Sequence, residues 1–205
     1  SPAKDLSHPV LRQRNKLPQY LRVQELTDFL DATCNRRTLA EEVVIMFMCN
    51  AGLRPSEICK LRPQDINIPS KTIAVTVKGG WLRLMPIATL LAETLGEYFQ
   101  EYNITTSSPL FVNKWGRPID ITWIQRLVRD ITRQAGIRRT VTPRTLRHTF
   151  ATYLAERHGK AVTRVLLGHA SGASTDTYMH LAPCQHRHYM NRHPFQTTPG
   201  KGGDL

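Results

Sequence analysis

The chain has 205 residues, of which 40% are hydrophobic, enough for one sizeable domain with a packed core, and its longest apolar run, around residues 43–48, is too short to span a membrane. The N-terminus has no signal-peptide pattern and the four cysteines form no CxxC pair, so we expect a cytoplasmic protein with reduced thiols and neither metal nor cofactor. The formal net charge of +12 favours a polyanionic partner, nucleic acid ahead of an anionic membrane, with a merely basic, well-solvated protein as the alternative.

The first third of the chain predicts an arm followed by helices. Residues 1–17 are polar and basic without periodicity, which indicates a linker or arm. Apolar spacing then predicts a helix that ends near Thr33. A Thr38-x-x-Glu41 capping box opens a second, more apolar helix that ends at Gly52. Pro55 fits the first turn of a short helix reaching about residue 61.

From residue 65 the hydrophobic period changes to two. Residues 66–68, 73–77 and 82–86 alternate apolar with polar side chains, and Lys78-Gly79-Gly80-Trp81 separates the last two runs. This pattern predicts a small three-stranded antiparallel sheet whose last two strands form a hairpin.

The remainder of the chain returns to helical spacing. Helices are predicted over residues 90–102, over 122–134 with a Thr122-x-x-Gln125 capping box, and over 142–158. In the last of these, Thr142 is the expected cap, Pro143 takes the first position and Gly159 follows the end. Two short helices are expected at 161–167 and 174–181, and disorder from about residue 194. The predicted fold class is therefore α+β and mainly helical.

Six side chains could carry chemistry, all cationic or hydrogen-donating groups except one phenol: Arg54, Lys78, Arg144, Arg147, His169 and Tyr178. Arg144 and Arg147 lie three residues apart in the first turn of a predicted helix, so their guanidinium groups share one face beside free backbone amides. Taken singly, each of the six is more typical of a solvated or packing residue. Together they are the parts needed to attack a phosphodiester without metal.

The order of these residues resembles the catalytic domain of the tyrosine recombinases, the family of phage integrases and chromosome-dimer resolvases. The segments RPSE at 54–57, LRHTFAT at 146–152 and LGH at 167–169 match the family pattern, as does the nine-residue spacing from His169 to Tyr178. The resemblance runs from about residue 16 to residue 182. It implies the tyrosine recombinase catalytic-domain fold for residues 18–182.

The resemblance also implies a role for each matched residue. Tyr178 would attack a DNA phosphodiester and form a 3′-phosphotyrosyl bond, while Arg54 and Arg147 bind the non-bridging oxygens. Lys78 would protonate the departing 5′-hydroxyl, and His169 would donate a hydrogen bond to the phosphate. The expected enzyme is a site-specific DNA recombinase that needs neither metal nor ATP. Its expected partner is double-stranded DNA in the prokaryotic nucleoid, bound by a homotetramer on paired sites, with a monomer as the alternative for the domain alone.

The sequence departs from the family pattern at two places. Arg144 stands where the family usually has histidine; an arginine keeps its proton, so Arg144 cannot be a general base, although it can donate to the phosphate. Family members also usually carry a separate helical domain that closes around DNA, and only about sixteen arm-like residues precede the catalytic region here. We therefore expect a truncated protein with weakened DNA affinity.

The C-terminal tail, residues 183–205, leaves three interpretations open. Residues 184–193 are dense in histidine and arginine, which fits a solvated basic tail better than a metal site with no fixed ligand geometry. The resemblance adds a segment that docks onto a neighbouring protomer. Two alternatives to the recombinase also remain: a type IB topoisomerase, and a non-catalytic DNA-binding regulator of the same fold in which Arg144 marks lost activity.

Overall fold

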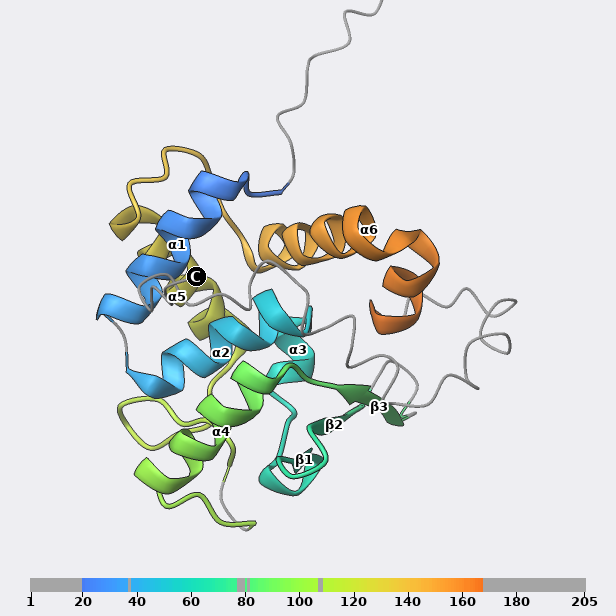
Figure 1. Ribbon diagram of the computed structural model, residues 1–205. Helices are drawn as coiled ribbons and strands as arrows, with labels where there is room; N and C mark the ends of the chain where they lie inside the picture. The colour runs from blue at the N-terminus through green and yellow to red at the C-terminus, as the bar shows by residue number, and fades with distance from the viewer. Residues whose placement is uncertain (1–19, 37, 77–79, 81, 107–108, 168–205) are drawn as a thin grey trace, which may run out of the picture.

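The computed structural model describes residues 20–36, 38–76, 80, 82–106 and 109–167. Their elements in chain order are α1 (Val23–Arg36), α2 (Leu39–Asn50), α3 (Pro55–Ile58), the 3-10 turn η1 (Pro63–Asp65), β1 (Ile66–Asn67), β2 (Thr72–Thr76), β3 (Leu82–Pro86), α4 (Thr89–Glu101), α5 (Ile121–Gln134) and α6 (Pro143–Leu167). Figure 1 shows α1, α2 and α5 on one side of the molecule, the small sheet on the other, and α6 above the sheet. The predicted mainly helical α+β class is confirmed.

Helix α2 is the centre of the core. Every residue from Val43 to Asn50 is buried, and the helix packs against α1, α4 and α6. Its start is the predicted capping box: the Glu41 N–H donates to Thr38 Oγ1 over 3.3 Å, and the Thr38 N–H donates to the Glu41 carboxylate over 3.2 Å. These bonds satisfy two of the backbone donors that a helix start leaves open.

The sheet has the predicted three antiparallel strands in the order β1-β2-β3. In the β2–β3 ladder Ile73 pairs with Met85 and Val75 pairs with Arg83. Partners across an antiparallel ladder point to the same face, and here Ile73, Val75 and Met85 are all buried. The register therefore directs the side chain of Arg83 inward as well.

Helix α6 is broken where the sequence predicts a boundary. Gly159 has φ 84° and ψ 161°, which divides the element into two helical segments. At its start the Thr145 N–H donates to Thr142 Oγ1 over 3.2 Å, as the predicted cap requires. Leu146, Phe150 and Leu154 are fully buried and form the core-facing stripe of the first segment.

The predicted start of α5 is wrong. The helix begins at Ile121, and the Asp120 carboxylate caps it by accepting from the Trp123 N–H over 2.6 Å. Thr122 is therefore inside the first turn and cannot be the cap. The physical reason is that a carboxylate adds charge complementarity with the helix N-terminus to the capping hydrogen bond, so Asp120 is the better cap.

Smaller differences concern helix lengths. Helix α1 continues to Arg36 beyond the predicted end near Thr33, and the short helix opened by Pro55 ends at Ile58. The predicted arm, the helix at 174–181 and the tail lie outside the described residues. Within the part of the chain that the structure describes, no helix is long and apolar enough to cross a membrane.

The residues that precede α1 are hydrogen-bonded to α6. The Leu21 N–H donates to Thr149 Oγ1 over 2.9 Å, and the Tyr153 hydroxyl donates to the Leu21 carbonyl over 3.1 Å. Arg139, in the turn before α6, binds both carboxylate oxygens of Glu25 at 2.7 and 2.8 Å. Hydrogen bonds thus connect the start of α1 to α6 and to the turn that precedes α6.

Candidate active site

Arg147 is held by two backbone carbonyls from distant parts of the chain. It lies in the first segment of α6 with its side chain partly buried. Its Nη1 donates to the carbonyl of Gly52, and its Nη2 donates to the carbonyl of Leu167 over 2.9 Å. Carbonyl acceptors orient a guanidinium without neutralising it. These two hydrogen bonds therefore fix the position of the Arg147 guanidinium.

Gly52 makes this contact possible. Its φ of +63° is a left-handed conformation that side chains disfavour. A Cβ at this position would lie 2.5 Å from Phe150 Cδ1 and 2.7 Å from Leu167 Cδ2. The missing side chain lets the end of α2 approach α6 closely and directs the Gly52 carbonyl at Arg147.

Arg54, two residues further on, is positioned by Glu57. Its backbone N–H donates to Glu57 Oε2 over 2.8 Å, and its Nη1 donates to Glu57 Oε1 over 2.9 Å. The Glu57 side chain is 5% exposed, whereas that of Arg54 is 45% exposed. A buried carboxylate thus fixes one edge of the guanidinium and leaves the other edge open to a ligand.

Burial and neighbouring charges shape the electrostatics of this pair. The pKa of Arg147 is lowered to about 10, chiefly by desolvation and then by the Arg54 charge; the Glu57 carboxylate raises this pKa and the Arg83 charge lowers it. A group with that pKa remains protonated at neutral pH. Concentrated, partly dehydrated positive charge of this kind attracts an anion strongly, because few waters compete with it.

Arg83 belongs to the same cluster and was not predicted as a site residue. Burial is the largest influence on the pKa of Arg83 and lowers it. The nearby Glu57 carboxylate raises this pKa, and the Arg54 charge lowers it. One signal in the sequence could have found it. Arg83 is the charged residue in a strand whose period places it on the face of Val75 and Met85, while its neighbours Leu82 and Leu84 are 70% and 60% exposed.

The structure brings together two of the six predicted site residues, Arg54 and Arg147. Arg144 lies exposed in the first turn of α6. The remaining three, Lys78, His169 and Tyr178, lie outside the described residues, so their predicted roles stay predictions.

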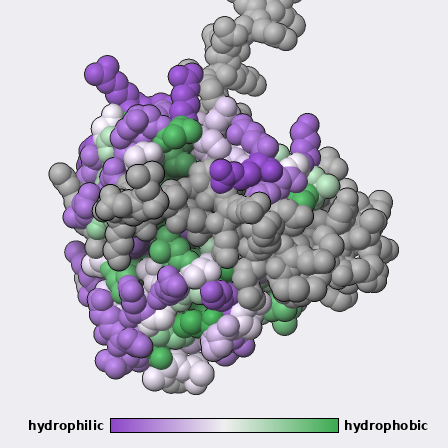
Figure 2. All heavy atoms as spheres, viewed as in Figure 1, coloured by the Kyte–Doolittle hydropathy of each residue, from purple (hydrophilic) through white to green (hydrophobic). Residues whose placement is uncertain are grey.

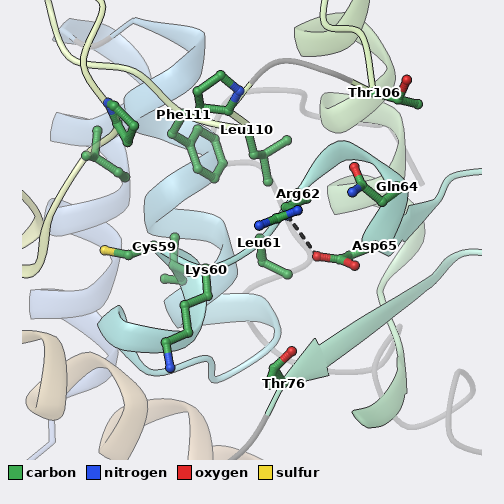
Figure 3. Close-up of a pocket in the computed structure, with 14 residues that line it drawn as sticks. Cys59, Lys60, Leu61, Arg62, Gln64, Asp65, Thr76, Thr106, Leu110 and Phe111 are labelled. Carbon is green, nitrogen blue, oxygen red and sulfur yellow. Dashed lines mark hydrogen bonds between the residues drawn. The ribbon is translucent and has the colours of Figure 1, made fainter. Parts of the chain in front are cut away.

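A separate pocket of about 880 Å³ opens between the turn after α3 and residues 109–119 (Figure 3). Cys59 and Lys60 line one side and Leu110 and Phe111 the other, while Asp65 accepts from the Arg62 N–H over 2.8 Å. None of the three clustered arginines lines it. The clustered arginines therefore lie in a different place from this pocket.

The phage integrase family matches residues 19–184 of this sequence. The chain belongs to this family. A tyrosine recombinase of Pseudothermotoga lettingae is 31% identical over 185 residues, covering 88% of this chain and 62% of that protein. The chain thus spans less than two thirds of this relative's length.

Solved structures show the same fold. The crystal structure of XerA recombinase superposes with a TM-score of 0.67 and 30% identity, covering 84% of this chain and 64% of that one. The XerH site-specific recombinase bound to its difH substrate, a pre-cleavage complex, gives a TM-score of 0.67 and 26% identity over 83% of this chain and 52% of that one.

Proposed function

We propose that this chain is the catalytic part of a site-specific DNA recombinase that cleaves and rejoins strands through a 3′-phosphotyrosyl intermediate. The observation that carries the proposal is the pair Arg54 and Arg147, each fixed by groups of the chain itself and near enough that the Arg54 charge lowers the pKa of Arg147. The DNA complex of the similar XerH recombinase supports duplex DNA as the source of that anion.

The fixed arginines fit phosphoryl transfer better than simple phosphate binding. As a nucleophile attacks phosphorus, negative charge accumulates on the non-bridging oxygens. Donors that are already oriented stabilise this transition state without reorganising. Removal of one such donor typically costs about 3 kcal/mol, or roughly a hundredfold in rate.

The remaining steps are assigned to the matched residues. The Tyr178 phenol releases its proton to water, its oxygen bonds to phosphorus and the bond from phosphorus to the 5′-oxygen breaks. Lys78 supplies the proton that the 5′-oxygen takes up. His169 donates a hydrogen bond to the phosphate. The covalent phosphotyrosine retains the energy of the broken ester, so a 5′-hydroxyl from another strand can rejoin it without ATP.

Assembly follows from the same proposal. Strand exchange between two DNA duplexes requires active sites on both duplexes. We assign these active sites to a homotetramer that binds paired sites in the prokaryotic nucleoid. Residues 183–205 are the candidate segment for docking between protomers. The strong positive charge of the chain suits this DNA-bound state, and hydrophilic side chains dominate much of the described surface in Figure 2.

The test is covalent capture on a pool of nicked duplexes with a randomised core, since the target sequence is unknown. The nick lets the cleaved fragment diffuse away, so the adduct accumulates. We expect a denaturant-resistant protein–DNA adduct that maps to Tyr178 by mass spectrometry and disappears in Tyr178→Phe. An adduct that survives this substitution would refute the assignment.

Two other outcomes identify the alternatives. Relaxation of supercoiled plasmid without site preference would indicate a type IB topoisomerase. Duplex binding with no adduct from any member of the pool would indicate a non-catalytic regulator.

A further inference from the structure

The guanidinium of Arg83 is a buried charge without a hydrogen-bond partner in the described part of the chain. All three of its guanidinium nitrogens are buried, and none has a hydrogen-bond partner among the residues that the structure describes. A buried ion without a partner is among the most unfavourable arrangements in a folded protein. It is therefore expected only where a ligand later completes the site.

The local backbone explains why Arg83 points into the site. Its partner in the ladder is Val75, which is fully buried, and two residues along the strand Met85 is 2% exposed. The period of the strand places Arg83 on this inward face, beside Glu57 and Arg54, whose charges both act on it.

Glu57 does not satisfy Arg83. The two oxygens of this carboxylate already accept from the backbone and side chain of Arg54, at 2.8 and 2.9 Å. The Glu57 carboxylate also acts on the charges of Arg83 and Arg147, although both of its oxygens already bind Arg54. A pentacoordinate phosphoryl-transfer transition state carries about two negative charges, so a cluster rich in guanidinium charge complements it better than it complements the singly charged ground state.

We propose that Arg83 is a third phosphate-binding arginine, which donates hydrogen bonds to the same DNA phosphate that Arg54 and Arg147 hold. This inference rests on the proposed function for the identity of the anion. It adds a catalytic residue from β3 to the two that the α2–α3 turn and α6 supply. Strand β3 thereby contributes the Arg83 side chain to the site.

The first test uses the stability of the full chain without DNA. Arg83→Met replaces the unpartnered charge by an apolar group of similar length, and we expect the Tm to rise by about 2–8 °C. Arg126→Met, at an exposed arginine on α5, is the matched control and should change Tm by less than about 2 °C. A fall in Tm for Arg83→Met would show that Arg83 supports the fold, and would overturn the proposal.

The second test measures DNA binding and needs no cleavage. The affinity for a 40-base-pair mixed-sequence duplex is titrated against salt for wild type and Arg83→Met. Loss of one phosphate contact should reduce the slope of log K against log salt by about 0.9. Arg83→Gln, which retains polarity, repeats the measurement should the methionine variant be poorly soluble. Unchanged slopes in both variants would contradict the proposal even if the protein never cleaved DNA.

The third test asks whether the contact is to the scissile phosphate. On a captured nicked duplex, Arg83→Met should lower the rate of adduct formation by roughly a hundredfold. When a neutral methylphosphonate replaces the scissile phosphate, the deficit should shrink to a few-fold, because one negative charge no longer needs a partner. An equal deficit on both substrates would place Arg83 away from this phosphate. A wild type without adduct would instead count against the proposed function, and the first two tests would still decide the role of Arg83.

Discussion

The guanidinium of Arg147 donates to the backbone carbonyl of Gly52, two residues before Arg54. The two arginines to which we assign phosphate binding are therefore connected through a main-chain contact. Any shift of the α2–α3 turn moves Arg54 and the support of Arg147 together. The local geometry of one glycine consequently controls both.

The Gly52→Ala variant tests this connection. The left-handed backbone costs an alanine about 1–2 kcal/mol, and the overlap with Phe150 and Leu167 adds about 1–3 kcal/mol. We expect a loss of about 2–5 kcal/mol in the free energy of unfolding, measured in urea. Gly136→Ala is the matched control, since Gly136 also has a positive φ, +69°, but nothing within 4 Å of the added carbon. Equal losses at the two positions would mean that the close approach at Gly52 is unimportant.

Arg144→His tests the position where the sequence departs from its family. Arg144 is exposed in the first turn of α6, and a histidine there could accept a proton where arginine cannot. We expect the rate of DNA cleavage to be preserved or raised, by up to about a hundredfold, with a new dependence on pH near the histidine pKa of about 6.5. The measurement is the rate of adduct formation between pH 5.5 and 8.5. A strong loss of cleavage would show that the guanidinium itself is required.

The Glu25–Arg139 pair predicts a pH dependence of stability. The hydrogen bond from Arg139 lowers the pKa of Glu25 below its ordinary value of 4.5. A depressed folded-state pKa stabilises the protein above the unfolded pKa, and this contribution is lost as the pH falls through the folded value. Glu25→Gln should therefore lose about 1–2 kcal/mol at pH 7 and progressively less as the pH falls from 5 to 3, as measured by urea unfolding.

A surface pair provides the comparison for Glu25. Arg133 and Asp130 are bonded at 3.2 Å with side chains 79% and 40% exposed. Asp130→Asn should change stability by less than about 0.5 kcal/mol at pH 7. The interpretation of Glu25 would be wrong if the two variants lost the same amount at every pH.

The corrected start of α5 gives a further pair of variants. Asp120→Ala removes the carboxylate that accepts from the Trp123 N–H, and should cost about 1 kcal/mol of stability. Thr122→Ala removes the cap that the sequence suggested, and should change stability by less than about 0.5 kcal/mol. Thermal unfolding of both variants decides between the two caps. A larger loss of stability for Thr122→Ala than for Asp120→Ala would show that Thr122 is the cap after all.

Features that depend on neighbouring residues could be predicted from the sequence. The capping box at Thr38 and Glu41 is an interaction across three residues, and Gly159 breaks α6 through its own backbone preference. The sheet was found because its period of two appears in the strand residues themselves. The start of α5 failed because two acceptable caps, Asp120 and Thr122, stand two residues apart, and the choice depends on small energies.

The contacts that hold the arginines of the candidate site in position could not be predicted from neighbouring residues. Gly52 and Arg147 are 95 positions apart, and no local pattern indicates that one carbonyl serves the other. Arg54 and Arg147 were identified by their resemblance to a family, which states the roles of residues but not the contacts that fix them. Arg83 was missed because its inward direction follows from the ladder register with Val75.

The break at Gly159 has a consequence for how the site is closed. Arg147 and Leu167 lie on the same element, and a continuous helix would separate them by about 30 Å over twenty residues. The turn at Gly159 folds the second segment back, so that the Leu167 carbonyl comes within 2.9 Å of Arg147 Nη2. The end of α6 thus lies beside its first segment, and the hydrogen bond from Arg147 to Leu167 connects the two. The backbone angle at Gly159 therefore sets where the described chain ends relative to Arg147.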